Sequence, residues 1–358
     1  MDRIAAVKEY VDGIINRIEN PEDRKYAMLH TYGVAWCCSL LAQKRGLKEE
    51  IGYISGLLHD IYTYFSGSAM CHGQSSAEMA RPAIKNMKLF SEEEKKLILS
   101  AVFYHSSKDR IHEEYDELLK DADILQTYYS TRKPKIPKAA LPRLKRLLKE
   151  LNIATEVTGY EPEAVEESLL FNRFKFAALA EALAGQNIKG ERESKEFLAI
   201  IKYYPESNAY EELKNSWCAA FVYHCALKAG LELPIKQPPY KYRFAGVGTW
   251  YSWGADKGFV FKDREGIIPE RGDIVIYNNI IPEGRKQENS PWHDHIGILL
   301  AVEEDYLLVA EGNVDNGNVS GIVNRKRDNT IGCFLRIPDG IKYDGFLCDY
   351  KVSEIYKQ

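Results

Sequence analysis

The spacing of apolar residues changes once along this chain of 358 residues, and no other feature constrains its fold as much. The first ~130 residues carry apolar side chains at helical spacing, as in residues 24–44, a stretch that Gly46 closes. After residue 215, one more helical stretch, 217–229, is followed by short β-branched or aromatic runs that are typical of strands. The sequence therefore predicts a multidomain chain in which an all-α half precedes an α+β half, and its length fits about two domains.

The individual elements follow from the same patterns. Helices are expected over residues 48–60, 75–87, 91–104 and 115–128, and Ser91 with Glu94 forms a capping box that marks one helix start. In the second half, helices are expected over 162–184 and 191–204, and strands over 274–277, 295–302, 306–311 and 333–337.

A change of charge separates the two halves. Residues 132–149 contain eight basic residues and no acidic one, whereas residues 152–172 contain five glutamates and no Lys or Arg. We favour a solvated connector whose two parts attract each other; a cationic rim that contacts a substrate phosphate is the alternative. The expected boundaries are 1–130 for the first domain, 131–172 for the connector, 173–345 for the second domain and 346–358 for a C-terminal tail.

Composition excludes several classes of protein. The chain is 45% hydrophobic and 28% charged, which is usual for globular proteins and unlike disordered, collagen-like or disulfide-dense ones. No apolar run approaches the ~18 residues of a membrane span, and the N-terminus has no signal-peptide pattern, so we expect a cytoplasmic protein without a membrane partner. A net charge of −4 argues against nucleic acid as a partner, and seven cysteines without a CxxC motif indicate free thiols.

Histidine and aspartate recur across the expected helices of the first half. The positions are His30, His59, Asp60, His72, His105 and Asp123. A single helical histidine is usually a core residue, but this many together indicate a metal site, and imidazole with carboxylate suits divalent transition metals. His59 and Asp60 lie about 100° apart on a helix, so both reach one metal only if the helix presents its edge.

The order of these residues resembles that of the HD-domain family of metal-dependent phosphohydrolases, over roughly residues 20–130. The resemblance rests on the segments 28–30, 56–61, 71–77, 102–106 and 119–125. It implies a first metal held by His30, His59, Asp60 and Asp123, and a second that His72 and His105 help to hold, with Asp60 bridging. Asp123 fits the family pattern better than Asp121. The implied cofactor is one or two divalent transition-metal ions, Mn, Fe, Co, Ni or Zn.

Such a site suits phosphoester hydrolysis. Two divalent ions lower the pKa of a shared water and neutralise phosphate oxygens. Lys108 and Arg110 follow His105 closely and are candidate phosphate contacts, although ordinary surface charges would give the same pattern. The expected substrate is a small phosphoester, with a nucleotide favoured.

A cysteine near the start of an expected helix is the main chemical feature of the second half. Cys218 would lie in the first turn of helix 217–229, where the positive end of the helix dipole stabilises a thiolate. Cys225, seven residues on, is interpreted as a packing residue. A cysteine nucleophile needs a base, and His295, which leads an apolar strand, is favoured over His293.

The base in turn needs a group that orients it. Glu311 and Asn313 are two residues apart, so on an extended strand both side chains point to one face, where either could bond the second nitrogen of His295.

This half resembles the CHAP family, cysteine- and histidine-dependent amidohydrolases and peptidases with a papain-like fold, over roughly residues 173–340. The resemblance rests on the segments 217–222, 250–254, 271–276, 294–298 and 311–313. It implies that Cys218 is the nucleophile, His295 the base, and Glu311 and Asn313 the orienting groups, with hydrolysis of an amide through an acyl-enzyme. Residues 278–291 form an insertion that departs from the family pattern.

Together these features predict a bifunctional hydrolase with a phosphoester substrate and a peptide or other amide substrate. Peptidoglycan peptides are one candidate, because a lysin released by a holin also lacks a signal peptide, and a cytoplasmic conjugate or protein is another. In the alternative hypothesis, the first half senses a nucleotide without turning it over and gates the cysteine amidase. The sequence makes no prediction about the oligomeric state.

Overall fold

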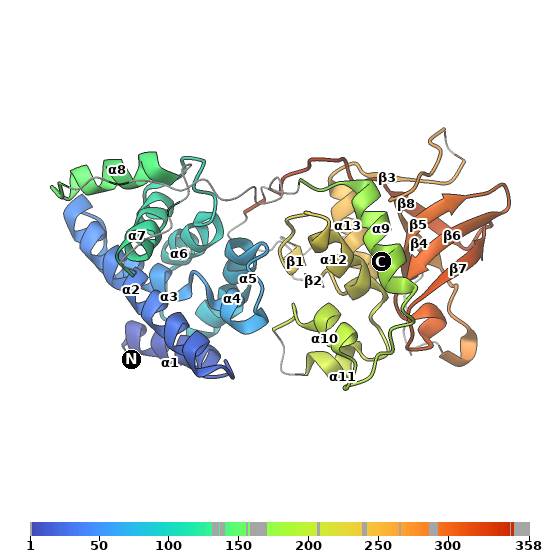
Figure 1. Ribbon diagram of the computed structural model, residues 1–358, viewed down its shortest axis with the longest axis horizontal. Coiled ribbons are helices and arrows are strands. Elements are labelled where there is room, and N and C mark those ends of the chain that lie inside the picture. The colour runs from blue at the N-terminus through green and yellow to red at the C-terminus, as the bar shows by residue number, and fades with distance from the viewer. Residues whose placement is uncertain are drawn as a thin grey trace. The chain divides into compact units, whose positions relative to one another are not determined.

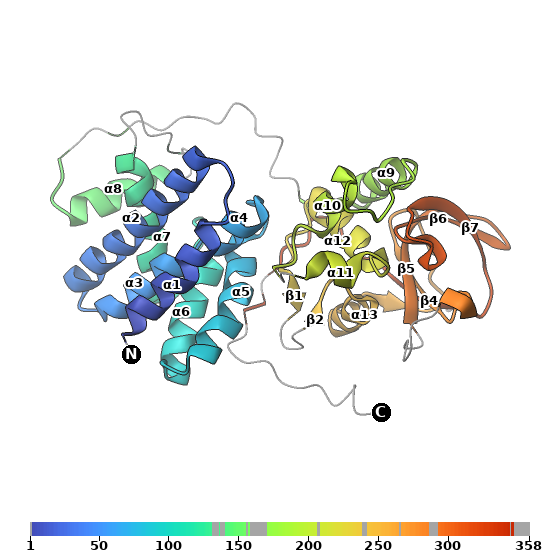
Figure 2. The same ribbon diagram turned by 90° about the horizontal axis from the view of Figure 1, so that it is seen from below.

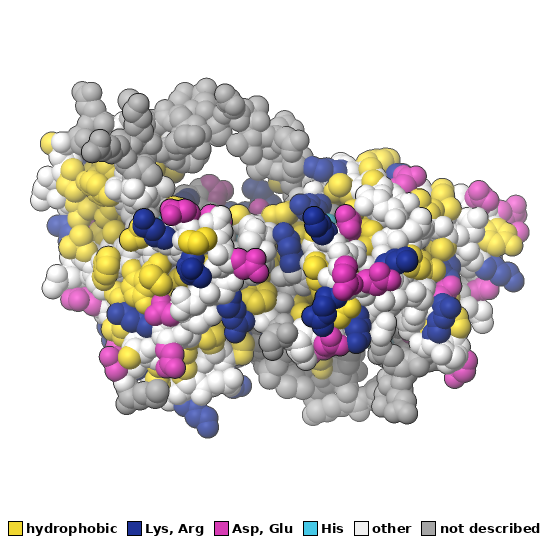
Figure 3. Space-filling view, turned by 60° about the horizontal axis from the view of Figure 1, so that its bottom comes forward, with side chains coloured by type: hydrophobic (Ala, Val, Ile, Leu, Met, Phe, Trp, Pro, Cys, Tyr) yellow, Lys and Arg dark blue, Asp and Glu magenta, His cyan; other side chains and the backbone are white. Residues whose placement is uncertain are grey.

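The computed structural model describes residues 2–130, 136, 140–154, 157, 170–205, 208–237, 242–264, 266–285, 293–343 and 345–346. The chain forms two compact units, Met1–Val165 with Phe346–Cys348, and Glu166–Gly345 with Asp349–Gln358. Side chains of both charges are interspersed on the face that Figure 3 shows, and apolar side chains gather on the first unit. No helix in the described part of the chain is long and apolar enough to span a membrane.

Within its described residues, the first unit consists of helices (Figures 1 and 2). They are α1 (Arg3–Ile15), α2 (Pro21–Arg45), α3 (Glu49–Leu58), α4 (Ile61–Ser66), α5 (His72–Met87), α6 (Glu92–Tyr104), α7 (Glu114–Ser130) and α8 (Leu141–Glu150). Helix α2 packs against α3 and α7, and α6 packs against the same two helices, so these four form the centre of the bundle.

Capping residues explain where the principal helices begin and end. The Asn20 side chain accepts from the backbone N–H groups at the start of α2, and Gly46 ends this helix in the left-handed conformation, with φ of 70°. The capping box of Ser91 and Glu94 is present at the start of α6, which confirms that prediction.

Several expected helices have different bounds in the structure: in the second unit, α9 begins at Arg173 and α10 covers only Lys195–Ile201, and in the first unit two such differences involve candidate ligands. The helix expected over 48–60 ends at Leu58, and α4 begins three residues later, so the helical conformation is interrupted at His59 and Asp60. The helix expected over 75–87 begins earlier, at His72, after Cys71 in the left-handed conformation. Both differences place candidate ligands at helix ends.

Part of the expected connector is helix α8 of the first unit. It buries Leu144, Leu147 and Leu148, and Arg143 forms ion pairs of 2.7 Å with Glu117 and 2.9 Å with Asp121. Arg143 is therefore used within the fold, which does not support a cationic rim at this residue. The other parts of the connector, 131–135, 137–139, 155–156 and 158–169, lie outside the described residues.

The second unit combines helices with a six-stranded antiparallel sheet, in the order β3-β8-β4-β5-β6-β7. Its helices are α9 (Arg173–Ala184), α10 (Lys195–Ile201), α11 (Ala209–Leu213), α12 (Cys218–Lys228) and α13 (Val247–Asp256). The sheet contains β3 (Val260–Phe261), β4 (Ile274–Asn278), β5 (His293–Val302), β6 (Tyr306–Glu311), β7 (Gly321–Lys326) and β8 (Ile331–Leu335), and β1 (Lys236–Gln237) pairs separately with β2 (Tyr242–Arg243). The predicted fold class, a helical first half and an α+β second half, is confirmed.

Helices α9, α12 and α13 pack against strands of this sheet (Figure 1). Val275, Tyr277, Leu299, Val309 and Phe334 belong to one fully buried cluster on the sheet. This packing fixes the end of β5, which carries His295, next to the start of α12, which carries Cys218. Strand β7 was not expected from the sequence, because its residues alternate between half-buried and exposed.

Candidate functional sites

Side chains selected from the sequence converge around Asp60 in the first unit. The Oδ2 atom of Asp60 lies 3.4 Å from His59 Nε2 and 3.7 Å from His30 Nε2. Its Oδ1 atom lies 3.4 Å from His105 Nε2 and 3.6 Å from His72 Nε2. Asp60 thus presents one oxygen to each of two histidine pairs, and each pair forms with Asp60 a group of ligand atoms close enough together to hold a metal ion.

The other ring nitrogen of each histidine is occupied. Nδ1 of His59, His72 and His105 lies 2.7–2.8 Å from the carbonyl oxygen three residues earlier, which is that of Gly56, Ala69 and Val102 respectively. Since a carbonyl oxygen only accepts, Nδ1 carries the proton and Nε2 keeps its lone pair. The rings are therefore held in the tautomer that a metal needs.

The break between α3 and α4 explains how His59 and Asp60 reach one place. His59 is the last helical residue in conformation, whereas Asp60 has φ of −114° and ψ of 13°, so the two side chains are not 100° apart as on a continuous helix. Gly56 brings α3 close to α2, because a Cβ atom there would lie 2.7 Å from the Cα atom of Ala35. That close approach sets His59 beside His30.

The charge states of this cluster suit a cation. Burial lowers the pKa of His59 to about 4 and also lowers the pKa of His105, so both imidazoles are neutral near pH 7. Burial alone would raise the pKa of Asp60, but the neighbouring histidines hold it well below its usual value.

Two buried polar atoms at the centre of the cluster test whether a metal fits. Asp60 Oδ1 and His105 Nε2 make no hydrogen bond of standard geometry with any residue that the structure describes. Unsatisfied buried polar atoms are costly, and a divalent cation would satisfy both. The donor set, neutral imidazoles around an ionised carboxylate, fits a divalent transition metal.

Asp123 joins the cluster from α7. Its Oδ1 atom lies 3.5 Å from His30 Nε2, and its other oxygen forms an ion pair with Lys108. Burial alone would raise the pKa of Asp123, but Lys108 and the histidines lower it. Asp121, the alternative in the same segment, points away, with ion pairs of 2.6 Å to Arg45 and 2.9 Å to Arg143.

The two expected phosphate contacts are placed differently. Lys108 lies at the cluster through its ion pair with Asp123, whereas the backbone carbonyl of Arg110 accepts from Lys120 and Arg143. Arg110 thereby helps to hold its own loop, and a phosphate contact by its guanidinium stays a prediction.

Sequence reasoning missed two neighbours of His30. Gln126 Oε1 lies 2.6 Å from His30 Nδ1, and the Tyr26 ring stacks on the imidazole with centroids 5.8 Å apart. Gln126 lies one helical turn after Asp123 on α7, so its spacing could have indicated a role on the same face.

In the second unit, His295 and Glu311 form a fully buried pair. His295 Nε2 lies 2.8 Å from Glu311 Oε2, and both side chains have 0% exposure. They come from the neighbouring strands β5 and β6. Gly297 makes room for this pair, because a Cβ atom there would lie 2.8 Å from Glu311 Cγ.

Cys218 is the first residue of α12 and is buried, and α12 packs against β5. Burial would lower the pKa of His295, but Glu311 and then Cys218 raise it to about 10. His295 Nδ1 has no hydrogen bond of standard geometry in the described part of the chain, so it is the nitrogen left to serve the thiol. Cys225 is fully buried in the same helix, where burial raises its pKa, consistent with a packing role.

Arg325 on β7 completes a buried chain of charges that the sequence did not predict. Its Nε atom lies 2.8 Å from Glu311 Oε1, its Nη2 atom bonds the other carboxylate oxygen, and its Nη1 atom lies 2.8 Å from Asp315 Oδ1. Burial alone would raise the pKa of Glu311, but His295 and Arg325 lower it to about 2. The Tyr277 ring stacks on His295 with centroids 6.1 Å apart and lies under the Arg325 guanidinium.

Asn313 does not orient His295, which corrects the expectation from strand spacing. Strand β6 ends at Glu311, and Asn313 adopts the left-handed conformation with φ of 53°. Its Nδ2 atom donates to the carbonyl of Asn215, at 2.9 Å, and its Oδ1 atom accepts from the Asn318 backbone. Asn313 therefore positions the segment that leads to Cys218.

The segment 278–291, which departs from the family pattern, starts at the end of β4. The backbone N–H groups of Ile280 and Ile281 donate to the Asp294 carboxylate, at 3.1 and 3.3 Å. Residues 286–292 lie outside the described residues. His293, the alternative candidate for the base, is the first residue of β5, and burial lowers its pKa. The Glu311 carboxylate forms its hydrogen bond with His295.

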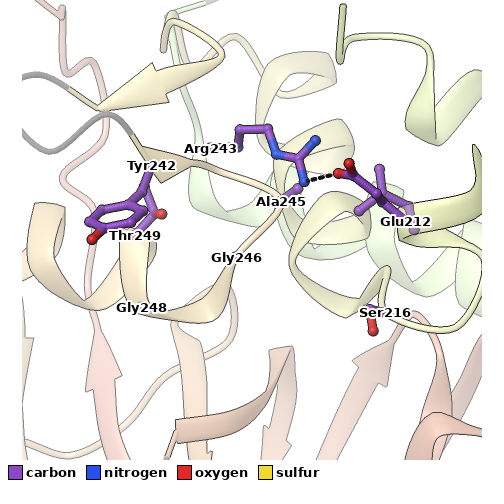
Figure 4. Close-up of a pocket in the computed structure, with 9 residues that line it drawn as sticks. Glu212, Ser216, Tyr242, Arg243, Ala245, Gly246, Gly248 and Thr249 are labelled. Carbon is purple, nitrogen blue, oxygen red and sulfur yellow. Dashed lines mark hydrogen bonds and ion pairs between the residues drawn. The ribbon is translucent and has the colours of Figure 1, made fainter. Parts of the chain in front are cut away.

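A pocket of about 380 Å³ lies beside the segment that leads to Cys218 (Figure 4). Its lining includes Glu212, Ser216, Arg243, Gly246, Gly248 and Thr249. Arg243 and Glu212 form an ion pair of 2.7 Å across one side, so the lining carries both charges. The volume is in the range of small-molecule sites.

Comparison with protein-family models gave two matches. Residues 28–128 match the model described as HD domain, and residues 209–313 match the model described as CHAP domain. The first range contains the six candidate ligands, and the second contains Cys218, His295, Glu311 and Asn313, but not Arg325. No curated protein and no solved structure matched the chain.

Proposed function

The chain carries an HD domain followed by a CHAP domain, and we propose that it is a bifunctional hydrolase whose first unit cleaves phosphoesters and whose second unit cleaves amide bonds. One observation carries this proposal: each unit buries a reactive cluster suited to one of these reactions. These are Asp60 between four histidines, and His295 between a cysteine and a carboxylate.

In the first unit, the proposed ligands of one divalent ion are His30, His59, Asp60 and Asp123, and those of a second are Asp60, His72 and His105. When bound, such ions polarise phosphate oxygens and lower the pKa of a coordinated water. The chain itself orients the imidazoles of His59 and His105 through their Nδ1 atoms, so that Nε2 of each faces Asp60, which lies between the two histidine pairs. The Lys108 ammonium, which forms an ion pair with Asp123, is the proposed partner of a phosphate oxygen.

We propose a small phosphoester as the substrate, with nucleotides as the first class to test. The candidate ligands are largely enclosed, and His72 is the most exposed of them, with 26% of its side chain accessible. Such a site suits a phosphate that projects from a small molecule, because only the phosphate has to reach the ligands.

The test combines metal analysis with turnover. The purified chain should hold a stoichiometric transition metal and release phosphate or a nucleoside from at least one member of a nucleotide panel. Asp60→Asn should lose both properties, and Asp109→Asn, an exposed aspartate of the same domain, should keep them. A metal-free protein without phosphoesterase activity would refute the proposal for this unit.

In the second unit, Cys218 is the proposed nucleophile. The thiol transfers its proton to His295 Nδ1, and the thiolate sulfur bonds the carbonyl carbon of the amide. As the C–N bond breaks, His295 returns the proton to the leaving amine, which leaves a thioester acyl-enzyme. Water then attacks the thioester carbon and His295 takes its proton, so that a carboxylic acid and the free thiol form. Glu311 stabilises the imidazolium throughout.

We propose a peptide as the amide substrate. The pocket beside Ser216 supports this choice, because its lining offers both a cation and an anion to the polar groups of an extended peptide. Iodoacetamide at neutral pH should label Cys218 faster than the half-buried Cys37. Peptidoglycan fragments and ordinary peptides should be compared as substrates with the wild type and with Cys218→Ala. Equal labelling of the two thiols would contradict the assignment.

The sensor hypothesis for the first unit predicts a different outcome of the same experiments. Nucleotide would bind the metal-loaded protein without turnover and would change the rate at which Cys218 is labelled. Turnover with no effect on Cys218 labelling favours the bifunctional hydrolase.

A further inference from the structure

Helix α2 carries a row of large apolar side chains on its outer side. Tyr26, Leu29, Trp36 and Leu40 are 62, 62, 63 and 53% exposed. With Gly33 between Leu29 and Trp36, they recur every three or four residues, so they form one stripe along the helix. The buried residues of α2, such as Val34 and Leu41, are the ones that face α3 and α7, so the stripe takes no part in the core.

The area of this stripe is large for a surface without a partner. Four large side chains that are each more than half exposed offer about 400–500 Å² of apolar surface. Contiguous apolar patches of ~300–600 Å² are the largest on typical monomers and often mark interaction sites. A standard interface buries about 800 Å² per partner, so the stripe with its polar rim is close to sufficient.

The pattern of α2 is self-complementary about Gly33. Glu22 and Lys44, both exposed, lie eleven residues before and after it, and Tyr26 and Leu40 lie seven residues before and after it. In an antiparallel pair of α2 helices that cross at Gly33, Glu22 of each copy therefore lies opposite Lys44 of the other copy. The twofold symmetry produces this charge pair two times. The same register sets Tyr26 against Leu40 of the second copy. Gly33 adds no side chain of its own at this point, and the Gln126 side chain of α7 lies over it, with its Cγ atom 2.8 Å from the position that a Cβ atom would take.

We infer that two copies of this chain associate through antiparallel α2 helices, related by a twofold axis at Gly33. This register brings Tyr26 to Leu40 and Glu22 to Lys44, and the opposite helix directions also align the helix dipoles favourably. This inference goes beyond the hydrolase activities and does not depend on them.

The first test is the mass of the full-length chain in solution, by sedimentation equilibrium across the micromolar range. The wild type should be a dimer, and Leu40→Asp should be a monomer, with a dissociation constant raised at least about a hundredfold because the contact is lost twice. Ile268→Asp changes a more exposed apolar residue of the second unit, 75% accessible, and should stay dimeric. A monomeric wild type, or a Leu40→Asp variant that dimerises like the wild type, would overturn the inference.

The second test examines the antiparallel register. Glu22→Lys alone and Lys44→Glu alone each place like charges against each other twice, and each should weaken the dimer about tenfold or more. The double variant should restore wild-type association. If the double variant associates no better than the single ones, the helices do not cross in this register.

Discussion

The hydrogen bond between Glu311 and His295 leads to a prediction that can be tested without knowing the substrate. Glu311→Gln keeps the size of the side chain and removes its charge. In the wild type, the carboxylate raises the pKa of His295 to about 10 against the effect of burial, so the imidazole holds a proton near pH 7. Without that charge, burial dominates and the pKa of His295 falls, so the imidazole loses its proton at a lower pH.

The size of this effect follows from the shifts at both partners. The pKa of His295 rises from 6.5 to about 10 and that of Glu311 falls from 4.5 to about 2, which corresponds to about 3–5 kcal/mol at ~1.36 kcal/mol per pKa unit. Cys218 and Arg325 account for part of it. If the Glu311 charge supplies only about 2 kcal/mol, the pKa of His295 still falls by about 1.5.

The assay is the rate of iodoacetamide alkylation at Cys218, followed by mass spectrometry from pH 5 to pH 11. We expect alkylation of Cys218 to be slower in Glu311→Gln than in the wild type near pH 7, by up to roughly thirtyfold, because a neutral imidazole favours the reactive form of a nearby sulfur less than an imidazolium does. Glu303→Gln, an exposed residue that follows β5, is the matched control and should behave as the wild type. If Glu311→Gln, shown to be folded by circular dichroism, has the wild-type profile, the proposed charge relation between Glu311 and Cys218 is wrong.

Three further predictions concern the groups around the two sites. Arg325→Met should destabilise the second unit by about 3 kcal/mol in chemical denaturation, because it leaves a buried carboxylate short of a partner. Arg325→Met should also raise the pKa of Glu311. In the wild type, the ionised Glu311 stabilises the fold in full above about pH 4.5, and this stabilisation is lost as the pH falls through about 2. The variant should lose the stabilisation at a higher pH. Gln126→Leu should weaken metal binding about tenfold or more in a competition assay, since His30 loses the group that orients its ring, and wild-type affinity would argue against that role. Removing metal by chelation should lower the melting temperature of the wild type but not that of Asp60→Asn, and equal shifts in both proteins would place the metal elsewhere.

Much of the fold could be predicted because it follows from local patterns. The helices α2, α6 and α7 and the strands β4, β5, β6 and β8 lie where apolar spacing placed them, since a period of 3.6 or 2 residues is visible within a short segment. The ends of α2 and α6 were also predictable, because their caps are made by residues within the first or last turn. Helix α8 was not predicted, since its leucines become buried only by packing against other helices, and strand β7 was not predicted, since its residues alternate between half-buried and exposed.

The residues of the candidate sites also fall into those that the sequence indicated and those that depend on tertiary contacts. The residue types and their order indicated a metal cluster and a cysteine–histidine pair, and the structure brings together the six candidate ligands as well as His295 with Glu311. Asn313 was assigned to the wrong neighbour, because the strand was assumed to continue past Glu311. Arg325 was missed, because nothing in its local sequence distinguishes it from a surface residue, and Gln126 was missed although it lies one helical turn after Asp123.

By itself, the sequence determined which chemical groups this protein has available and on which kinds of element they lie. Only the tertiary structure decided which oxygen of Asp60 faces which histidines, and that Glu311 lies between an imidazole and a guanidinium. The physical reason is that hydrogen bonds within a helical turn or a strand depend on residues nearby in the chain. Contacts such as that between His30 and Gln126, 96 residues apart, depend on how whole elements pack.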